Sequence, residues 1–150
     1  MAIYFFEEET QARLKQRRLV KRWIQDISLQ KGFRIQSLNF IFCTDPYLLD
    51  INISYLKHDT YTDIITFDQS EIKGNIEADI FISTDRVKEN AYQQNSNYHT
   101  ELLRVMIHGV LHLCGYKDSS PEEKNQMRRE ETRALQLFES LSVPRGTPKR

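Results

Sequence analysis

Two histidines four residues apart are the residues of this sequence whose spacing points most directly to chemistry. His108 and His112 lie in an apolar run, and in a helix two residues at this spacing project from the same face. Gly115 follows at a position where a glycine in the left-handed conformation commonly ends a helix. Asp118 is the strong oxygen ligand in the turn beyond it. Two imidazoles and one carboxylate predict a catalytic zinc site, which takes three protein ligands and leaves one position for water.

Other interpretations of the two histidines stay open. Both residues also suit ordinary half-buried positions of an amphipathic helix. The zinc-protease motif with this spacing places its general base, a glutamate, directly after the first histidine, whereas this chain has Gly109 there. A glycine inside a helix costs about 1 kcal/mol relative to alanine. We therefore expect a packed neighbour or a substrate to approach the backbone closely at Gly109.

Size and composition predict one domain in the cytoplasm. A chain of 150 residues suits a single core, and we place the domain at residues 1–143, followed by a disordered basic tail at 144–150. The net charge is +0, so nucleic-acid binding requires a local patch. No apolar run approaches the ~20 residues of a membrane span, and the N-terminus lacks the features of a secretory signal. Cys43 and Cys114 lie far apart, which is typical of reduced, semi-buried cysteines.

Hydrophobic periodicity and turn residues predict a mixture of strands and helices around the histidine helix. Strands are predicted at 3–6, 35–42, 62–67 and 76–82. Helices are predicted at 10–31, from Asp45 and Pro46 onward, at 84–94 and at 120–141. This order predicts an α+β fold class: a single small domain with helices packed on a short mixed β-sheet. The metal site is expected on a central helix and the turn after it.

The run from His108 to Asp118 resembles the signature of the bacterial YbeY family, the rRNA maturation factors and metal-dependent endoribonucleases. The family pattern is H-G-x-L-H-L-x-G-Y-D-H, and its three histidines bind zinc. The resemblance therefore implies that His108 and His112 are zinc ligands, while Asp118 stands where the family has its third histidine. A carboxylate is an accepted zinc ligand, although oxygen ligands favour other divalent ions, such as Mn²⁺, somewhat more.

The resemblance covers residues 48–131. Three further segments match family patterns: 52–55 and 62–67, which resemble N-x-x-Y-R…P-T-D-V-L-S-F, and 78–83, which resembles G-D-I-x-I-S. Glu101 matches a glutamate that the family carries seven residues before the first histidine. Two positions depart from the pattern. Leu56 stands where the family has an arginine implicated in RNA cleavage, and Tyr61 replaces the proline before the Thr-Asp pair.

Three residues are candidates for catalysis beside the metal. Phosphodiester cleavage needs cations near the phosphoryl oxygens, and Lys57 and Arg104 are the candidates. Lys57 adjoins Leu56, but an ammonium lacks the bidentate fork of a guanidinium. Arg104 lies one helical turn before His108, where it also suits a salt bridge or a surface charge. Glu101 lies one turn earlier and either hydrogen-bonds a ligand imidazole or pairs with Arg104 at the i, i+3 spacing.

The resemblance implies a zinc-dependent, single-strand-specific endoribonuclease in 16S rRNA 3′-end maturation and ribosome biogenesis. The partners that it implies are single-stranded RNA, expected to be rRNA, and the small ribosomal subunit, with neither DNA nor membrane. The alternative is a ribosome-associated RNA- or protein-binding module with weak or no nuclease activity, because Leu56 and Asp118 depart from the pattern. A metalloprotease is a second alternative, against which Gly109 argues. Chemistry alone permits hydrolysis of a peptide, an amide or a phosphodiester.

Overall fold

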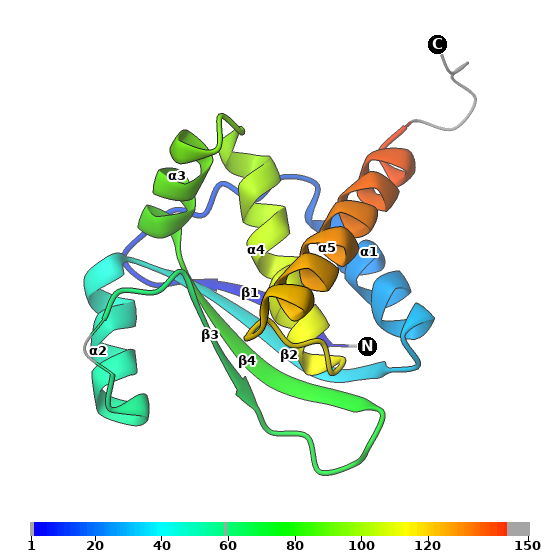
Figure 1. Ribbon diagram of the computed structural model, residues 1–150, viewed down its shortest axis with the longest axis horizontal. Coiled ribbons are helices and arrows are strands. Elements are labelled where there is room, and N and C mark those ends of the chain that lie inside the picture. The colour runs from blue at the N-terminus through cyan, green and yellow to red at the C-terminus, as the bar shows by residue number, and fades with distance from the viewer. Residues whose placement is uncertain (1, 59, 144–150) are drawn as a thin grey trace.

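A computed structural model of the chain describes residues 2–58 and 60–143 (Figure 1). Within these residues there are four strands and five helices. In chain order they are β1 (Ile3–Glu7), α1 (Arg17–Gln30), β2 (Arg34–Cys43), α2 (Asp45–Leu56), β3 (Ile64–Asp68), β4 (Asn75–Ser83), α3 (Thr84–Gln93), α4 (Tyr98–Leu113) and α5 (Pro121–Leu141). The predicted α+β class is confirmed. The predicted tail at 144–150 lies outside the described residues, so the domain boundary at 143 stays a prediction.

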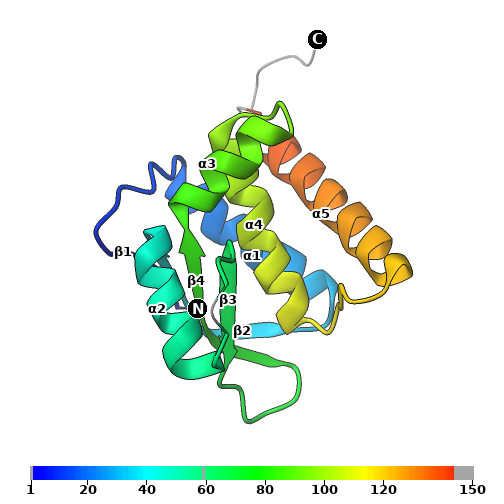
Figure 2. The same cartoon turned by 60° about the vertical axis from the view of Figure 1, so that its left-hand side comes forward.

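The four strands form one mixed sheet in the order β1-β2-β4-β3. The β1–β2 and β2–β4 pairs are parallel, and β3 runs antiparallel to β4. Side chains alternate between the two faces of a strand, and on β4 the buried apolar residues are Ile76, Ala78, Ile80 and Ile82. Figure 2 shows α1, α4 and α5 on this core face and α2 on the opposite face. The predicted sheet with helices packed on it is therefore observed, with β3 as an edge strand.

The first long helix begins later than predicted. The sequence pattern predicted a helix over 10–31, but α1 begins at Arg17. Gln16, directly before it, adopts a left-handed conformation with φ of 55°, which a continuing helix excludes. The segment before the helix is held by tertiary contacts instead: Ala12 is fully buried, and its carbonyl accepts a hydrogen bond from the Tyr98 hydroxyl at 2.7 Å. These contacts outweigh local helix propensity.

The central helix α4 lies directly on the sheet at Gly109. A Cβ atom built at Gly109 would lie 2.9 Å from Ile64 Cδ1 and 3.0 Å from Ile80 Cδ1. These isoleucines belong to β3 and β4. Of the two expectations for Gly109, a packed neighbour is therefore the one observed. The glycine sets the depth at which the histidine helix sits on the sheet.

The remaining sequence expectations concern membranes and cysteines. Among the described helices, none is long and apolar enough to cross a membrane. Both cysteines are free; Cys43 is buried and Cys114 is half-buried. Burial raises the pKa of the Cys43 thiol to about 12 and that of the Cys114 thiol to about 11. The thiols therefore stay protonated near neutral pH, as expected of packing residues.

Candidate metal centre

The end of α4 is fixed by a turn at Gly115. Gly115 has φ of 97°, and its N–H donates to the His112 carbonyl at 3.0 Å. The next N–H, that of Tyr116, donates to the Leu111 carbonyl at 3.0 Å. This pair of hydrogen bonds is the Schellman arrangement that satisfies the last carbonyls of a helix. The predicted helix stop is confirmed, and it turns the chain back toward the histidine face.

The start of α5 fixes the other side of the same short loop. The Ser120 hydroxyl accepts a hydrogen bond from the Glu123 N–H at 3.1 Å, and the Glu123 carboxylate accepts one from the Ser120 N–H at 2.9 Å. The same carboxylate oxygen accepts the Ser119 N–H at 3.1 Å. These hydrogen bonds lower the pKa of Glu123, so the capping box stays ionised and intact near neutral pH. Asp118 is thus carried on a loop that is anchored at both ends.

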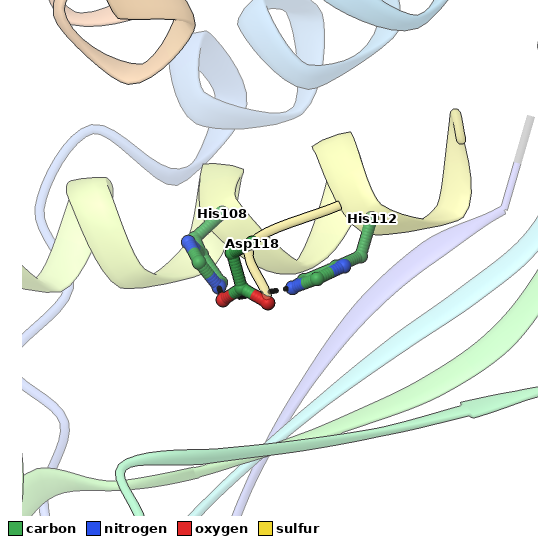
Figure 3. Close-up of side chains that lie close together, drawn as sticks. All are labelled: His108, His112 and Asp118. Carbon is green, nitrogen blue, oxygen red and sulfur yellow. Dashed lines mark ion pairs between the residues drawn. The ribbon is translucent and has the colours of Figure 1, made fainter. Parts of the chain in front are cut away.

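The three predicted ligands converge at this loop (Figure 3). Asp118 Oδ2 lies 3.2 Å from His108 Nε2 and 3.4 Å from His112 Nε2. One ligand atom from each of the three residues lies within 4.8 Å of the others. The two rings are 4.7 Å apart between centroids and are inclined by 77°. Both imidazoles therefore present the same kind of nitrogen, Nε2, to one carboxylate oxygen.

This arrangement fits a divalent metal ion. In a tetrahedral site with metal–ligand bonds of about 2.0–2.2 Å, neighbouring ligand atoms are about 3.3–3.6 Å apart. The two nitrogen–oxygen distances, 3.2 and 3.4 Å, are close to this separation. Two imidazoles with one carboxylate are a common catalytic zinc set. The site is also accessible, because the Asp118 side chain is 41% exposed and that of His112 is 34% exposed.

His108 is held by Glu131, a residue that the sequence analysis did not select. Glu131 Oε2 lies 2.6 Å from His108 Nδ1, and the Glu131 side chain is only 6% exposed. Burial opposes the charged imidazolium, but the hydrogen bond and the charge of Glu131, together with Asp118 and Asp63, outweigh it and raise the pKa of His108. An acceptor on Nδ1 leaves Nε2 free for a metal, which is the usual role of a carboxylate behind a metal-binding histidine.

A signal for Glu131 was present in the sequence. The buried residues of α5 follow a helical stripe and are Met127, Glu131, Ala134 and Phe138. An acid at a position that the helical period assigns to the core is expensive to bury unless it is paired. Such an acid is therefore a marker for an ion pair or a polar site beneath the helix.

Arg104 and Glu101 continue the network behind His108. Arg104 Nη1 lies 3.3 Å from Glu131 Oε1, and Arg104 Nε lies 3.7 Å from Glu101 Oε1. Of the two predictions for Glu101, the pairing with Arg104 is observed. Glu101 Oε1 is buried and has no hydrogen-bond partner among the described residues. Burial raises the pKa of Glu101, against the opposing effect of Arg104.

Two hollows are lined in part by His108 and Asp118. The first, which we call the arginine hollow, has a volume of about 300 Å³ and is lined by both residues together with Arg104 and Arg128. The second, the strand hollow, has a volume of about 480 Å³ and lies against β3. Asp63 lines both. Its burial raises its pKa, although His108 acts in the opposite direction, and its Oδ2 accepts a hydrogen bond from Asn90 at 3.2 Å.

Lys57 lies apart from the other candidates. It caps the end of α2 in a left-handed conformation with φ of 60° and is exposed. Among the described residues, those that line the two hollows do not include Lys57.

Arg128 does line the arginine hollow; its side chain is 55% exposed, and Nη1 lies 3.8 Å from Glu131 Oε1. The sequence analysis did not select Arg128, which is one of several arginines on a charged helix.

The fold and the site together define a small α+β domain with a candidate metal centre at the end of its central helix. The chain belongs to the family described as Endoribonuclease YbeY, whose sequence model matches residues 4–139. This match confirms the resemblance to the YbeY family that was inferred from the run between His108 and Asp118.

Individual relatives agree over nearly the whole chain. An Endoribonuclease YbeY of Cytophaga hutchinsonii is 53% identical over 135 residues, which cover 90% of this chain and 94% of the relative. Another, of Amoebophilus asiaticus, is 44% identical over 130 residues, which cover 87% of this chain and 88% of the relative. A solution structure of a Thermotoga maritima protein has a TM-score of 0.59 at 23% identity, covers 98% of this chain and 99% of its own, and shows the same fold.

Proposed function

We propose that the chain is a metal-dependent endoribonuclease that cuts single-stranded RNA during maturation of small-subunit rRNA in the cytoplasm. The observation that carries the proposal is the convergence of His108, His112 and Asp118 within 4.8 Å, in a chain whose relatives are named endoribonucleases. The two free cysteines agree with a reducing compartment. The small ribosomal subunit is the partner proposed on the same family grounds.

The metal that we propose is one zinc ion. His108 and His112 would hold it through Nε2, and Asp118 would hold it through a carboxylate oxygen. A bound divalent cation supplies a Lewis acid for a phosphoryl oxygen and lowers the pKa of bound water to about 7. The carboxylate also suits Mn²⁺, so metal analysis of protein purified without added metal decides the native ion.

The residues behind the ligands fix the geometry of the site. Glu131 accepts from His108 Nδ1 with one carboxylate oxygen and faces Arg104 with the other. The Arg104 guanidinium, 3.3 Å from Glu131 Oε1, holds the carboxylate in place behind the imidazole. Glu101 in turn faces Arg104. In this arrangement Arg104 and Glu101 act through Glu131 as positioning residues.

A cation that can reach the phosphate is also required. We propose Arg128 for this role, because it lines the arginine hollow with His108 and more than half of its side chain is exposed. Lys57, beside the position of the family's arginine, stays the alternative prediction. Arg128→Ala and Lys57→Ala separate the two: the substitution of the phosphate-binding residue raises the KM for RNA, and the other leaves it unchanged. Equal effects of Arg128→Ala and Lys57→Ala on the KM for RNA would contradict the assignment of Arg128 as the phosphate-binding residue.

The binding-module alternative has one observation in its favour. At the position of the family's arginine this chain exposes an apolar side chain, Leu56, to 41%. The metalloprotease alternative has no such support, since the place of its general base is taken by Gly109, which packs against the sheet.

One set of assays distinguishes these functions. Purified protein is incubated with single-stranded RNA and with casein, each with and without a chelator. We expect RNA cleavage that the chelator abolishes, and no casein hydrolysis. The His112→Ala variant serves as the control for a contaminating nuclease, because it lacks a ligand. Cleavage that persists unchanged in His112→Ala would overturn the proposal, and RNA binding without cleavage would favour the binding module.

A further inference from the structure

A groove with aromatic walls lies between α2 and the strands β3 and β4. The walls include Tyr47 and Tyr55 from α2 and Phe67 and Phe81 from the strands, and the volume is about 600 Å³. The Phe67 ring lies 5.9 Å from that of Tyr55 and 5.8 Å from that of Phe81, both edge-to-face. We call this site the aromatic groove. Its size is that of a site for a small flat molecule.

One of the aromatic rings of the groove, that of Tyr55, is open to solvent. Tyr55 is 72% exposed, although the Phe67 ring beside it is partly buried. A large ring held at the mouth of a groove by a single aromatic contact adds little to the core. The faces of aromatic rings that line a groove are platforms on which nucleobases stack.

The aromatic groove is continuous with the strand hollow of the metal centre. Thr66 and Asp68 line both the groove and the hollow. They belong to β3, which is an edge strand of the sheet, so only the width of one strand, about 5 Å, separates the two sites. A flexible chain can therefore cross β3 and occupy both. Figure 2 shows this strand between α2 and α4.

The rim of the groove suits the edge of a base and not a phosphate. The polar lining includes Asp68, Asp79 and Gln69, and among the described lining residues there is no lysine or arginine. Carboxylates repel phosphate but accept hydrogen bonds from the N–H groups of bases. Asp79 uses Oδ1 to accept from Asn39 at 3.0 Å. The cations lie instead in the arginine hollow, beyond the metal ligands.

We propose that the aromatic groove binds one nucleobase of single-stranded RNA, stacked on Tyr55 and Phe67, next to the candidate metal centre. The inference rests on the proposed endoribonuclease function and adds to it a subsite beside the cleaved bond. It explains a preference for single strands in physical terms, because a base that is paired in a duplex cannot enter the groove.

Binding of fluorescent single-stranded RNA, measured by anisotropy with chelator present, tests this subsite without cleavage. Tyr55→Ala removes the stacking ring, and Tyr92→Ala on α3 is the matched control, because Tyr92 is also a helical tyrosine and is 82% exposed. Loss of one stacking contact weakens binding by roughly 5- to 150-fold. We expect this loss for Tyr55→Ala, a change of less than about twofold for Tyr92→Ala, and wild-type binding for Tyr55→Phe.

RNAs with a single abasic nucleotide, placed at each position in turn, then locate the bound base. In the wild type one position next to the cut weakens binding, and in Tyr55→Ala the same position has no further effect. Equal RNA affinity of the wild type and Tyr55→Ala overturns the subsite and leaves the nuclease in place. Self-association that Tyr55→Ala removes, with RNA binding unchanged, assigns the groove to a second copy and also overturns it. A wild-type protein that neither binds nor cuts RNA overturns both proposals.

Discussion

Replacing Glu131 by glutamine removes the charge that orients His108 and keeps the shape of the side chain. One carboxylate oxygen of Glu131 lies 2.6 Å from His108 Nδ1, and the other lies 3.3 Å from Arg104 Nη1. Glutamine has only one oxygen. In Glu131→Gln the amide N–H₂ must therefore face a donor, either His108 Nδ1 or Arg104 Nη1. Water cannot easily relieve this mismatch, because the Glu131 side chain is only 6% exposed.

The expected losses follow from these contacts. Replacing the partner behind a ligand histidine weakens metal binding by about 10- to 100-fold, which corresponds to about 1.4–2.8 kcal/mol. Losing a buried hydrogen bond to a charged group costs about 1.5–3 kcal/mol of folding free energy. We therefore expect Glu131→Gln to lose zinc affinity and to unfold at a lower urea concentration, even in the absence of metal.

The neighbouring glutamate is the matched control. Glu130 lies on the same helix and pairs with Lys31 at 2.6 Å and with Arg133 at 3.0 Å. Glu130→Gln therefore removes the same charge and weakens two ion pairs, but Glu130 touches none of the three candidate ligands. Zinc affinity is measured by competition with a chromogenic chelator. Zinc affinities of the two variants within about twofold of each other would refute the role of Glu131.

Three further substitutions or reactions test other parts of the site and fold. Asp118→Asn should lose metal while Asp118→His retains or gains it, as measured by metal analysis after gel filtration; equal content in all three proteins would place the third ligand elsewhere. Gly109→Glu should lower the melting temperature, because its Cβ meets Ile64 and Ile80 at 2.9 and 3.0 Å and overpacking costs about 1–3 kcal/mol; a wild-type melting curve would contradict this. Because burial raises the pKa of Cys43 to about 12, its thiolate fraction at pH 8 is roughly 10⁻⁴ and rises about tenfold per pH unit. Iodoacetamide should therefore label Cys43 quickly only in urea, and fast labelling of the folded protein would count against a buried, protonated thiol.

Local sequence patterns were enough to predict that His108, His112 and Asp118 lie close together. The spacing of His108 and His112 placed both rings on one helical face, and Gly115 indicated where that helix ends. The helix predicted at 120–141 indicated where the next helix begins. Each of these patterns involves residues that are only a few positions apart, so it can be recognised from one sequence without knowledge of tertiary contacts. The structure brings the groups together because both helix ends are fixed.

Features that depend on distant contacts were not predicted. Glu131 lies 23 residues from His108 in the sequence, and only the packing of α5 on α4 brings the two together. The irregular segment before α1 was mistaken for helix, because the hydrogen bond from Tyr98 to Ala12 that holds it comes from another part of the chain. The function of Gly109 also became clear only when the isoleucines of β3 and β4 were placed against it.

Anomalous diffraction at the zinc absorption edge, from crystals grown with zinc, tests most directly whether these side chains hold a metal ion. We predict one peak about 2.0–2.2 Å from Nε2 of His108, from Nε2 of His112 and from a carboxylate oxygen of Asp118. Imidazoles without a peak between them, with the aspartate turned away, would contradict the metal centre and the hydrolytic function that depends on it.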